Sequence, residues 1–183
     1  MNRTGKIALS VVATWAVVGV MGCATAPATP EKKVALDQEA QALISRMSSD
    51  DPTLRAFLDR SHGYVAFPSI GKGAVGIGGA YGRGVVYERG VVVGYADVTQ
   101  GSIGFQLGGQ SYSQLVVFKD QPTFDSFKSG NFTFAANASA VAAKAGAAAA
   151  TDFQDGSAVF TRSDAGLMYE AAVGGQRFTF QAK

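Results

Sequence analysis

The chain has 183 residues, of which 47% are hydrophobic and 16% charged, a balance that suits one globular domain with a buried core. Sixteen basic residues stand against fourteen acidic ones, so the formal net charge is only +2. Nucleic acid is therefore disfavoured as a partner, because affinity for a phosphate backbone depends on an excess of Lys and Arg.

Residues 1–22 read as a lipoprotein signal peptide. Arg3 and Lys6 form a basic N-terminal region. The apolar stretch over residues 7–21 is shorter than a transmembrane helix, which needs about 20 residues. The sequence VMGC over residues 20–23 resembles a bacterial lipobox, in which the cysteine becomes the N-terminus and carries acyl chains such as palmitate. Cys23 is the only cysteine, so a disulfide within the chain is excluded. An ordinary signal peptide with an incidental cysteine is the alternative.

The residue after Cys23 also bears on localisation. It is Ala24 rather than the Asp associated with inner-membrane retention, so we expect an anchored protein of the cell envelope, at the outer membrane and facing the periplasm or the cell surface. Because Arg3 and Lys6 leave with the signal peptide, the mature chain is formally neutral.

A lipidated N-terminus and a tether over residues 23–33 should precede a single domain over residues 34–183. The tether is rich in Ala, Thr and Pro and shows no apolar period. The domain opens with a predicted amphipathic helix, since apolar residues recur at helical spacing at Leu36, Ala40, Leu43, Ile44 and Met47. A second helix is expected from Asp51 as N-cap and Pro52 at the first helical position, with Gly63 ending it.

A glycine-rich β region follows. Thirteen of the 23 glycines lie between Gly71 and Gly109, and each costs a helix about 1 kcal/mol relative to Ala, whereas the intervening Val, Ile, Tyr and Phe suit strands. Pro68 is expected to end the first strand. The expected strands cover residues 64–67, 75–80, 84–87, 91–98, 103–107 and 112–118.

The C-terminal part begins with a short helix over residues 120–129, capped by Asp120 and ended by Gly130. Residues 135–150 are ambiguous, because alanines favour helix while the flanks favour strand, and the prediction leans to strands. A meander of strands over residues 158–161, 167–173 and 177–181 should finish the chain. The predicted fold class is α+β: helices at the N-terminus and a mainly antiparallel, Gly-rich sheet, either open or rolled into a barrel.

Few residues are suited to catalysis. His62 is the only histidine and is expected to lie at a helix end, so neither a Cys/His pair nor a metal site is predicted, and no cofactor is expected. Residues 71–76 (GKGAVG) match Gly-x-Gly-x-x-Gly, but no helix can follow them to receive a pyrophosphate. The sequence therefore predicts a protein that is not an enzyme, with a hydrolase built on His62 as a distant alternative.

Basic residues near turns are the remaining candidates for a functional surface. Basic side chains beside apolar surface can meet anionic headgroups. The candidate lipid-binding residues are Lys32, Lys33, Lys72, Arg83 and Arg89. The alternative is that they are scattered surface charges balanced by nearby acids such as Asp97.

Several ordered blocks resemble the SYLF domain family. They are residues 64–69 (YVAFPS), the glycine array that ends at Gly84, residues 101–110 (GSIGFQLGGQ), the helix with Phe124 and Phe127, and residues 160–168 (FTRSDAGLM). The resemblance covers roughly residues 35–181. It implies a lipid-binding or membrane-interacting domain, with residues 32–47 as the candidate membrane-contacting helix, and bacterial members of the family are often lipoproteins.

Two functions are therefore expected. The first is a lipid-anchored, non-catalytic envelope protein whose domain binds phospholipid. The alternative is a structural lipoprotein that binds an envelope protein through the edge of its sheet.

Overall fold

The computed structural model describes residues 27–73, 79–101, 111–134, 139–142, 144–163, 170–172 and 175–183. Three helices lie in these segments: α1 (Pro30–Asp50), α2 (Leu54–Asp59) and α3 (Gln121–Lys128). The predicted strand at 103–107 and the turn at 108–109 lie outside the described residues.

Eight strands form one sheet in the order β7-β5-β6-β4-β1-β2-β3-β8. The strands are β1 (Gly63–Gly73), β2 (Gly79–Glu88), β3 (Val91–Gly101), β4 (Ser111–Phe118), β5 (Ser139–Ala142), β6 (Ser157–Ser163), β7 (Glu170–Ala172) and β8 (Gln176–Ala182). Every described ladder is antiparallel except β5–β6. The α+β class and the mainly antiparallel sheet are thus confirmed, and of the two forms left open, the described strands adopt the open sheet.

The sheet is strongly curled. β4 and β8 are four positions apart in the strand order, yet the Nε2 of Gln114 donates to the Oε1 of Gln176 at 2.9 Å, and both side chains are fully buried. The Nε2 of Gln176 in turn donates to the hydroxyl of Tyr112 at 3.2 Å. These side chains can meet only if the strands between them wrap around a common interior.

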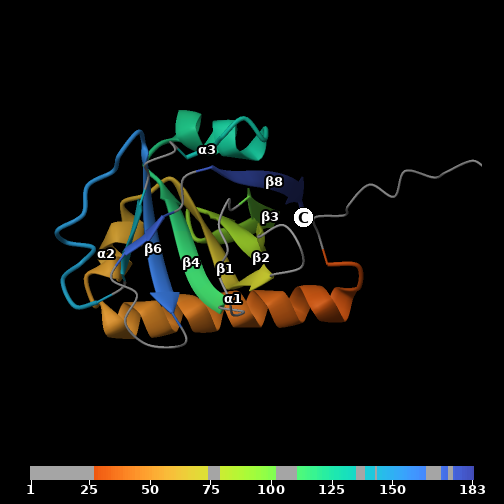
Figure 1. Ribbon diagram of the computed structural model, residues 1–183, viewed down its shortest axis with the longest axis horizontal. Coiled ribbons are helices and arrows are strands. Elements are labelled where there is room, and N and C mark those ends of the chain that lie inside the picture. The colour runs from red at the N-terminus through yellow and green to blue at the C-terminus, as the bar shows by residue number, and fades with distance from the viewer. Residues whose placement is uncertain are drawn as a thin grey trace, which may run out of the picture.

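Helices lie on both sides of the sheet, α1 on one and α3 on the other (Figure 1), and each face supports its own core. β4 shows the alternation, since Leu115 and Val117 belong to the cluster beneath α1 and α2, while Val116 and Phe118 belong to the cluster beneath α3. All four side chains are fully buried, as predicted for this segment. The second core is mainly aromatic, with the Phe118 and Phe127 rings 4.9 Å apart.

The first helix begins earlier than predicted. Thr29 accepts a hydrogen bond from the backbone N–H of Lys32 at 3.4 Å as N-cap, and Pro30 occupies the first turn, so Pro30–Lys33 belong to α1 rather than to a tether. The helix then buries Ala40, Leu43, Ile44 and Met47, all of them predicted for its apolar face.

The second helix starts later than predicted. α2 begins at Leu54 after the N-cap Thr53, and it ends at Asp59 instead of Gly63, which lies in β1. Asp51 is not the N-cap of this helix. Its carboxylate accepts hydrogen bonds from the backbone N–H groups of Thr53, Gly146 and Ala148, so it joins the start of α2 to a distant segment. Local capping rules could not show so distant a partner.

Two strand boundaries were also wrong. Pro68 does not end β1, because it lies at a register shift between Ala66 and Ser69, where a missing N–H is tolerated. β2 runs unbroken through Gly82 and Arg83, which were expected to separate two strands.

The C-terminal strands do not form a meander. β6 lies between β4 and β5, while β7 and β8 occupy opposite edges of the sheet. In the ambiguous stretch, residues 139–142 form β5 and residues 145–150 form turns. The short helix over residues 120–129 is confirmed as α3, with the N-cap Asp120 accepting from the backbone N–H of Thr123 at 3.0 Å.

Candidate functional site

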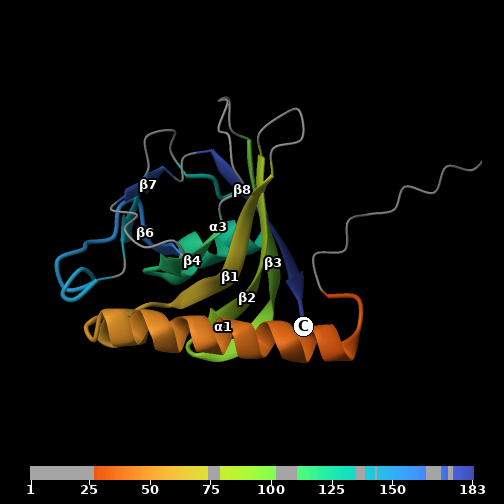
Figure 2. The same cartoon turned by 60° about the horizontal axis from the view of Figure 1, so that its bottom comes forward.

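A cavity of about 640 Å³ opens between α1, α2 and the turn that joins β2 to β3. In Figure 2 this turn reaches the side of α1. The volume is typical of small-molecule sites. The lining residues are Gln41, Ile44, Ser45, Arg55, Leu58, Asp59, Ser61, Tyr64, Tyr87, Arg89 and Gly90, and we call this cavity the α1–α2 pocket.

The inner part of the pocket is apolar and aromatic. The Tyr64 and Tyr87 rings stack with centroids 4.9 Å apart and planes at 19°, beside Ile44 and Leu58. Burial raises the pKa of both phenols, and Asp59 raises that of Tyr64 further while Arg55 lowers it. Both phenols are therefore neutral at physiological pH, so this part of the pocket carries no charge of its own.

The rim of the pocket carries the charge. The Arg55 Nε lies 3.9 Å from the Asp59 carboxylate, with about 70% of each side chain exposed, so this ion pair is weak and solvated. Arg89 is exposed as well. Two guanidinium groups against one carboxylate leave the rim with a net positive charge.

The β2–β3 turn places Arg89 at the rim. Arg89 and Gly90 have φ of 49° and 80°, the left-handed pair of a type I′ turn that joins two antiparallel strands. The backbone N–H of Arg89 donates to the carbonyl of His62 at 3.1 Å, which ties the turn to the start of β1. Val91 follows at once and is 65% exposed.

Of the five candidate lipid-binding residues, only Arg89 lines this pocket. Arg83 instead makes a 3.0 Å ion pair with Asp97, whose side chain is buried. It lies six residues before Arg89, about 20 Å along an extended strand, so the two arginines do not share a rim.

The other candidates lie elsewhere or cannot be placed. Lys32 and Lys33 are in the first turn of α1, where the Lys33 Nζ lies 5.6 Å from the centre of the Tyr95 ring. Lys72 is part of β1, but its side chain is not among those described, and Cys23 lies outside the described residues.

Sequence reasoning missed Arg55, Tyr64 and Tyr87 as pocket residues. Tyr64 and Tyr87 are partners in the β1–β2 register, a pairing that no local pattern reveals. Arg55 lies on α2, and its place at a pocket shared with the β2–β3 turn depends on how α2 packs against the sheet, which no local pattern shows.

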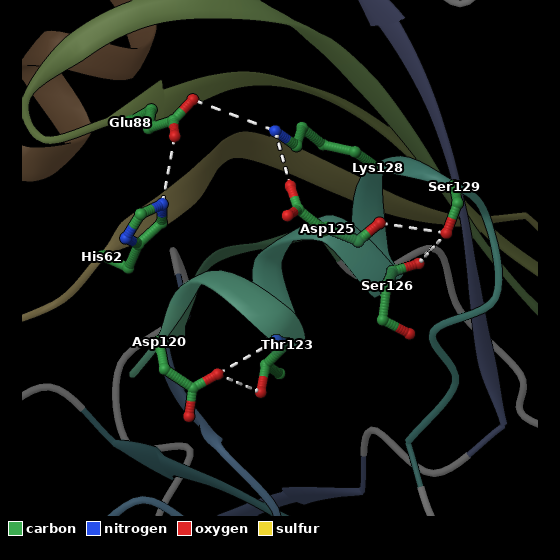
Figure 3. Close-up of polar contacts among 8 residues, drawn as sticks. All are labelled: His62, Glu88, Asp120, Thr123, Asp125, Ser126, Lys128 and Ser129. Atoms are coloured by element: carbon green, nitrogen blue, oxygen red, sulfur yellow. Dashed lines mark hydrogen bonds and ion pairs between the residues drawn. The ribbon is translucent and has the colours of Figure 1, made fainter.

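His62 has a bridging role on the opposite face. Its Nε2 lies 3.0 Å from a Glu88 carboxylate oxygen, and its ring centre is 5.6 Å from that of Phe124 in α3. The Nζ of Lys128 lies 3.9 Å from the other Glu88 carboxylate oxygen and 2.9 Å from the Asp125 carboxylate (Figure 3). These contacts tie α3 to the β2–β3 hairpin, which is a structural task.

The described residues offer neither a cluster of metal ligands nor a membrane-spanning helix. No group of three or more His, Cys, Asp or Glu side chains in those segments is arranged to hold a metal ion. None of the helices described is both long and apolar enough to cross a membrane.

Comparison with known proteins identifies the C-terminal part. Residues 99–183 match the model of the Ysc84 family, described as "Las17-binding protein actin regulator". This part of the chain is therefore similar to a Ysc84 (SYLF) family domain. The match extends from the end of β3 through β8, and the resemblance expected from the sequence is thereby confirmed.

A curated relative supports the same relationship. The chain is 24% identical over 153 residues to "Beta cell expansion factor A" of Aeromonas veronii. The match covers 81% of this chain but only 57% of that protein, so the chain spans little more than half of its relative.

Proposed function

We propose that this chain is a lipid-anchored bacterial envelope protein whose SYLF domain binds phospholipid membrane surfaces and catalyses no reaction. The observation that carries the proposal is the α1–α2 pocket, where the exposed Arg55 and Arg89 lie at the rim, with Asp59, and stacked tyrosines lie inside. Similarity to the SYLF family supports it, because the family in general binds lipids. Anionic headgroups contribute about 1 kcal/mol for each Lys or Arg near the membrane surface.

The anchor is proposed to be Cys23, lipidated after removal of residues 1–22, with the outer membrane as its destination. Residues 24–29 would then separate the lipid from α1, which begins at Pro30. Cells that make the full chain and are fed a clickable palmitate analogue should label it, whereas Cys23→Ser should abolish the label. Undiminished labelling of Cys23→Ser would remove the anchor from the proposal.

Lipid binding by the domain itself needs a separate test. Residues 24–183 contain every described contact and lack the proposed lipid. This protein should co-sediment with phosphatidylglycerol vesicles more than with phosphatidylcholine vesicles, and less at 500 mM than at 50 mM salt. Full recovery in the supernatant with both lipids would contradict lipid binding by the domain.

Binding of an envelope protein through a sheet edge is the second candidate. β7 and β8 are the edge strands, but β8 also makes an isolated bridge through Arg177 to Thr133, which occupies part of its outer side. A partner recovered by cross-linking in cells, and lost when β8 is altered, would favour this candidate.

A further inference from the structure

The tip of the β2–β3 hairpin combines three features that no other described part of the chain brings together. Arg89 carries an exposed positive charge, and Val91 is a large apolar residue that is 65% exposed. The α1–α2 pocket opens beside them. Arg55 adds a second exposed guanidinium on the far side of the pocket.

We propose that this face, defined by Arg55, Arg89, Val91 and the mouth of the α1–α2 pocket, is the side of the domain that docks on an anionic bilayer. Val91 enters the acyl boundary, and the pocket receives the phosphodiester headgroup of one lipid. This inference rests on the proposed function and adds the orientation of the domain and the site of contact.

The charge of the rim fits such a headgroup. Arg55 and Arg89 against Asp59 leave one net positive charge, which complements a singly charged phosphodiester. The carboxylate that precedes the turn, Glu88, does not line the pocket and instead contacts His62 at 3.0 Å and Lys128 at 3.9 Å. Guanidinium groups suit a phosphodiester because they donate in a planar fork.

The apolar part of the surface fits as well. Val91 follows a rigid two-residue turn whose backbone is held by the His62 carbonyl, so the tip presents its side chain without an ordering cost. Behind the tip, the stacked Tyr64 and Tyr87 rings and Leu58 form a mainly apolar wall of the pocket.

The start of α1 is the competing docking face. It carries Lys32, Lys33 and Val34, and Val34 is 55% exposed. Val34 lies seven to eleven residues before the α1 residues Gln41 and Ser45 that line the pocket, about 10–17 Å along the helix. This separation is large enough for an experiment to distinguish the two faces.

A tryptophan reporter makes the distinction directly. The only tryptophan of the chain is Trp15, so residues 24–183 contain none, and Val91→Trp or Val34→Trp introduces a single fluorophore. With vesicles of brominated phosphatidylglycerol, we expect a blue shift and strong quenching for Val91→Trp, and little change for the matched control Val34→Trp. The reverse pattern, or co-sedimentation without quenching at either position, would overturn the proposed orientation.

Charge variants test the headgroup site. Arg89→Asn keeps a residue that accepts the left-handed turn, and Arg55→Gln lies on an exposed helix face, so both should fold. Each should lower the partition coefficient on phosphatidylglycerol vesicles about fivefold, whereas Arg46→Gln, an exposed α1 residue outside the pocket, should lower it less than twofold. Equal losses for all three variants would show bulk attraction without a headgroup site and would overturn the proposal.

A soluble short-chain lipid distinguishes recognition of a lipid headgroup from recognition of free phosphate. Dihexanoylphosphatidylglycerol below its micelle concentration should bind residues 24–183 with one-to-one stoichiometry, and Arg89→Asn should weaken this binding about fivefold. Inorganic phosphate at the same concentration should not compete. Competition by phosphate would overturn the lipid headgroup as the ligand, and absence of sedimentation with any vesicle would instead refute the proposed function itself.

Discussion

At the scale of single residues, Asp51 connects parts of the chain that are far apart in sequence. One carboxylate oxygen accepts from the backbone N–H and hydroxyl of Thr53 at 3.0 and 2.6 Å and from the N–H of Gly146 at 3.1 Å. The other accepts from the N–H of Ala148 at 2.7 Å. The side chain thus holds the turns after β5 against the junction of α1 and α2.

Removing this carboxylate should destabilise the fold. Asp51→Ala leaves the N–H of the buried Ala148 without its partner, so we expect the free energy of unfolding to fall by about 2–3 kcal/mol in urea titrations. The neighbouring Asp50 is 41% exposed and pairs only at the surface with Arg162 at 2.8 Å, so Asp50→Ala should cost less than about 1 kcal/mol. Equal losses would contradict the role given to Asp51.

The same carboxylate predicts a pH dependence. Burial alone would raise the pKa of Asp51, but hydrogen bonds from Thr53, Ala148 and Gly146 outweigh it and lower the pKa below its ordinary value. Because the folded-state pKa is depressed, this stabilisation is present above the unfolded-state pKa of about 4 and is lost as pH falls through the folded-state pKa. Unfolding of wild type should become easier below about pH 4, and Asp51→Asn should flatten that part of the profile. An unchanged profile would show that other carboxyls control it.

Two buried tyrosines allow a matched comparison. The Tyr112 hydroxyl accepts a hydrogen bond from Gln176, and burial raises the pKa of Tyr112 to about 12, whereas the buried Tyr87 hydroxyl has no hydrogen-bond partner among the described residues. We expect Tyr112→Phe to cost about 1 kcal/mol of unfolding free energy and Tyr87→Phe to cost nothing or to stabilise the protein slightly. Thermal unfolding in which Tyr87→Phe is the more damaging change would contradict this difference.

At the scale of elements, sequence reasoning succeeded where the determinants are local. The apolar period of α1, the Asp120 cap of α3 and the continuous apolar run of β4 each carry their information within a few residues. It failed where a distant segment decides the outcome: Pro68 is tolerated because of a bulge, and β7 and β8 separate because they pair with β5 and β3. The pocket depends on the same long-range pairing, so only Arg89 could be predicted.

The β3–β8 contact depends on a glycine. A Cβ on Gly94 would collide with the carbonyl oxygen of Gln181 and the ring of Phe180 in the adjacent strand. We expect Gly94→Ala to lower the free energy of unfolding by about 1–3 kcal/mol, with the largest rise in amide exchange along β8. Gly101→Ala in the same strand, where a Cβ would meet nothing within 4 Å, is the control and should leave β8 protected.

In the β2–β3 turn, a substitution is expected to raise the stability of the fold. Arg89 adopts the left-handed conformation, which Asn tolerates better than most residues, so Arg89→Asn should raise the free energy of unfolding by up to about 1 kcal/mol. Arg89→Val, with a β-branched side chain, should lower it by a similar amount. A stability gain with loss of lipid binding in Arg89→Asn would show that Arg89 is retained for binding rather than for folding.

At the scale of the whole molecule, the curled sheet holds two cores, and its α1 face carries the proposed membrane contact. α3 and its aromatic core lie on the other face, fastened to the hairpin by His62, Glu88 and Lys128. The C-terminus lies beside the first half of α1, where Lys183 approaches Asp37 at 3.9 Å. In this arrangement the pocket and the hairpin tip lie together and can meet one bilayer.

Hydrogen–deuterium exchange of residues 24–183, with phosphatidylglycerol vesicles and with phosphatidylcholine vesicles, tests this arrangement most directly. Anionic vesicles should slow exchange in residues 54–64 and 87–92, with little change along β8, and phosphatidylcholine should leave all segments as they are in solution. Slower exchange confined to residues 30–40 would move the contact to the start of α1. Exchange that neither lipid slows in any segment would contradict membrane binding by the domain.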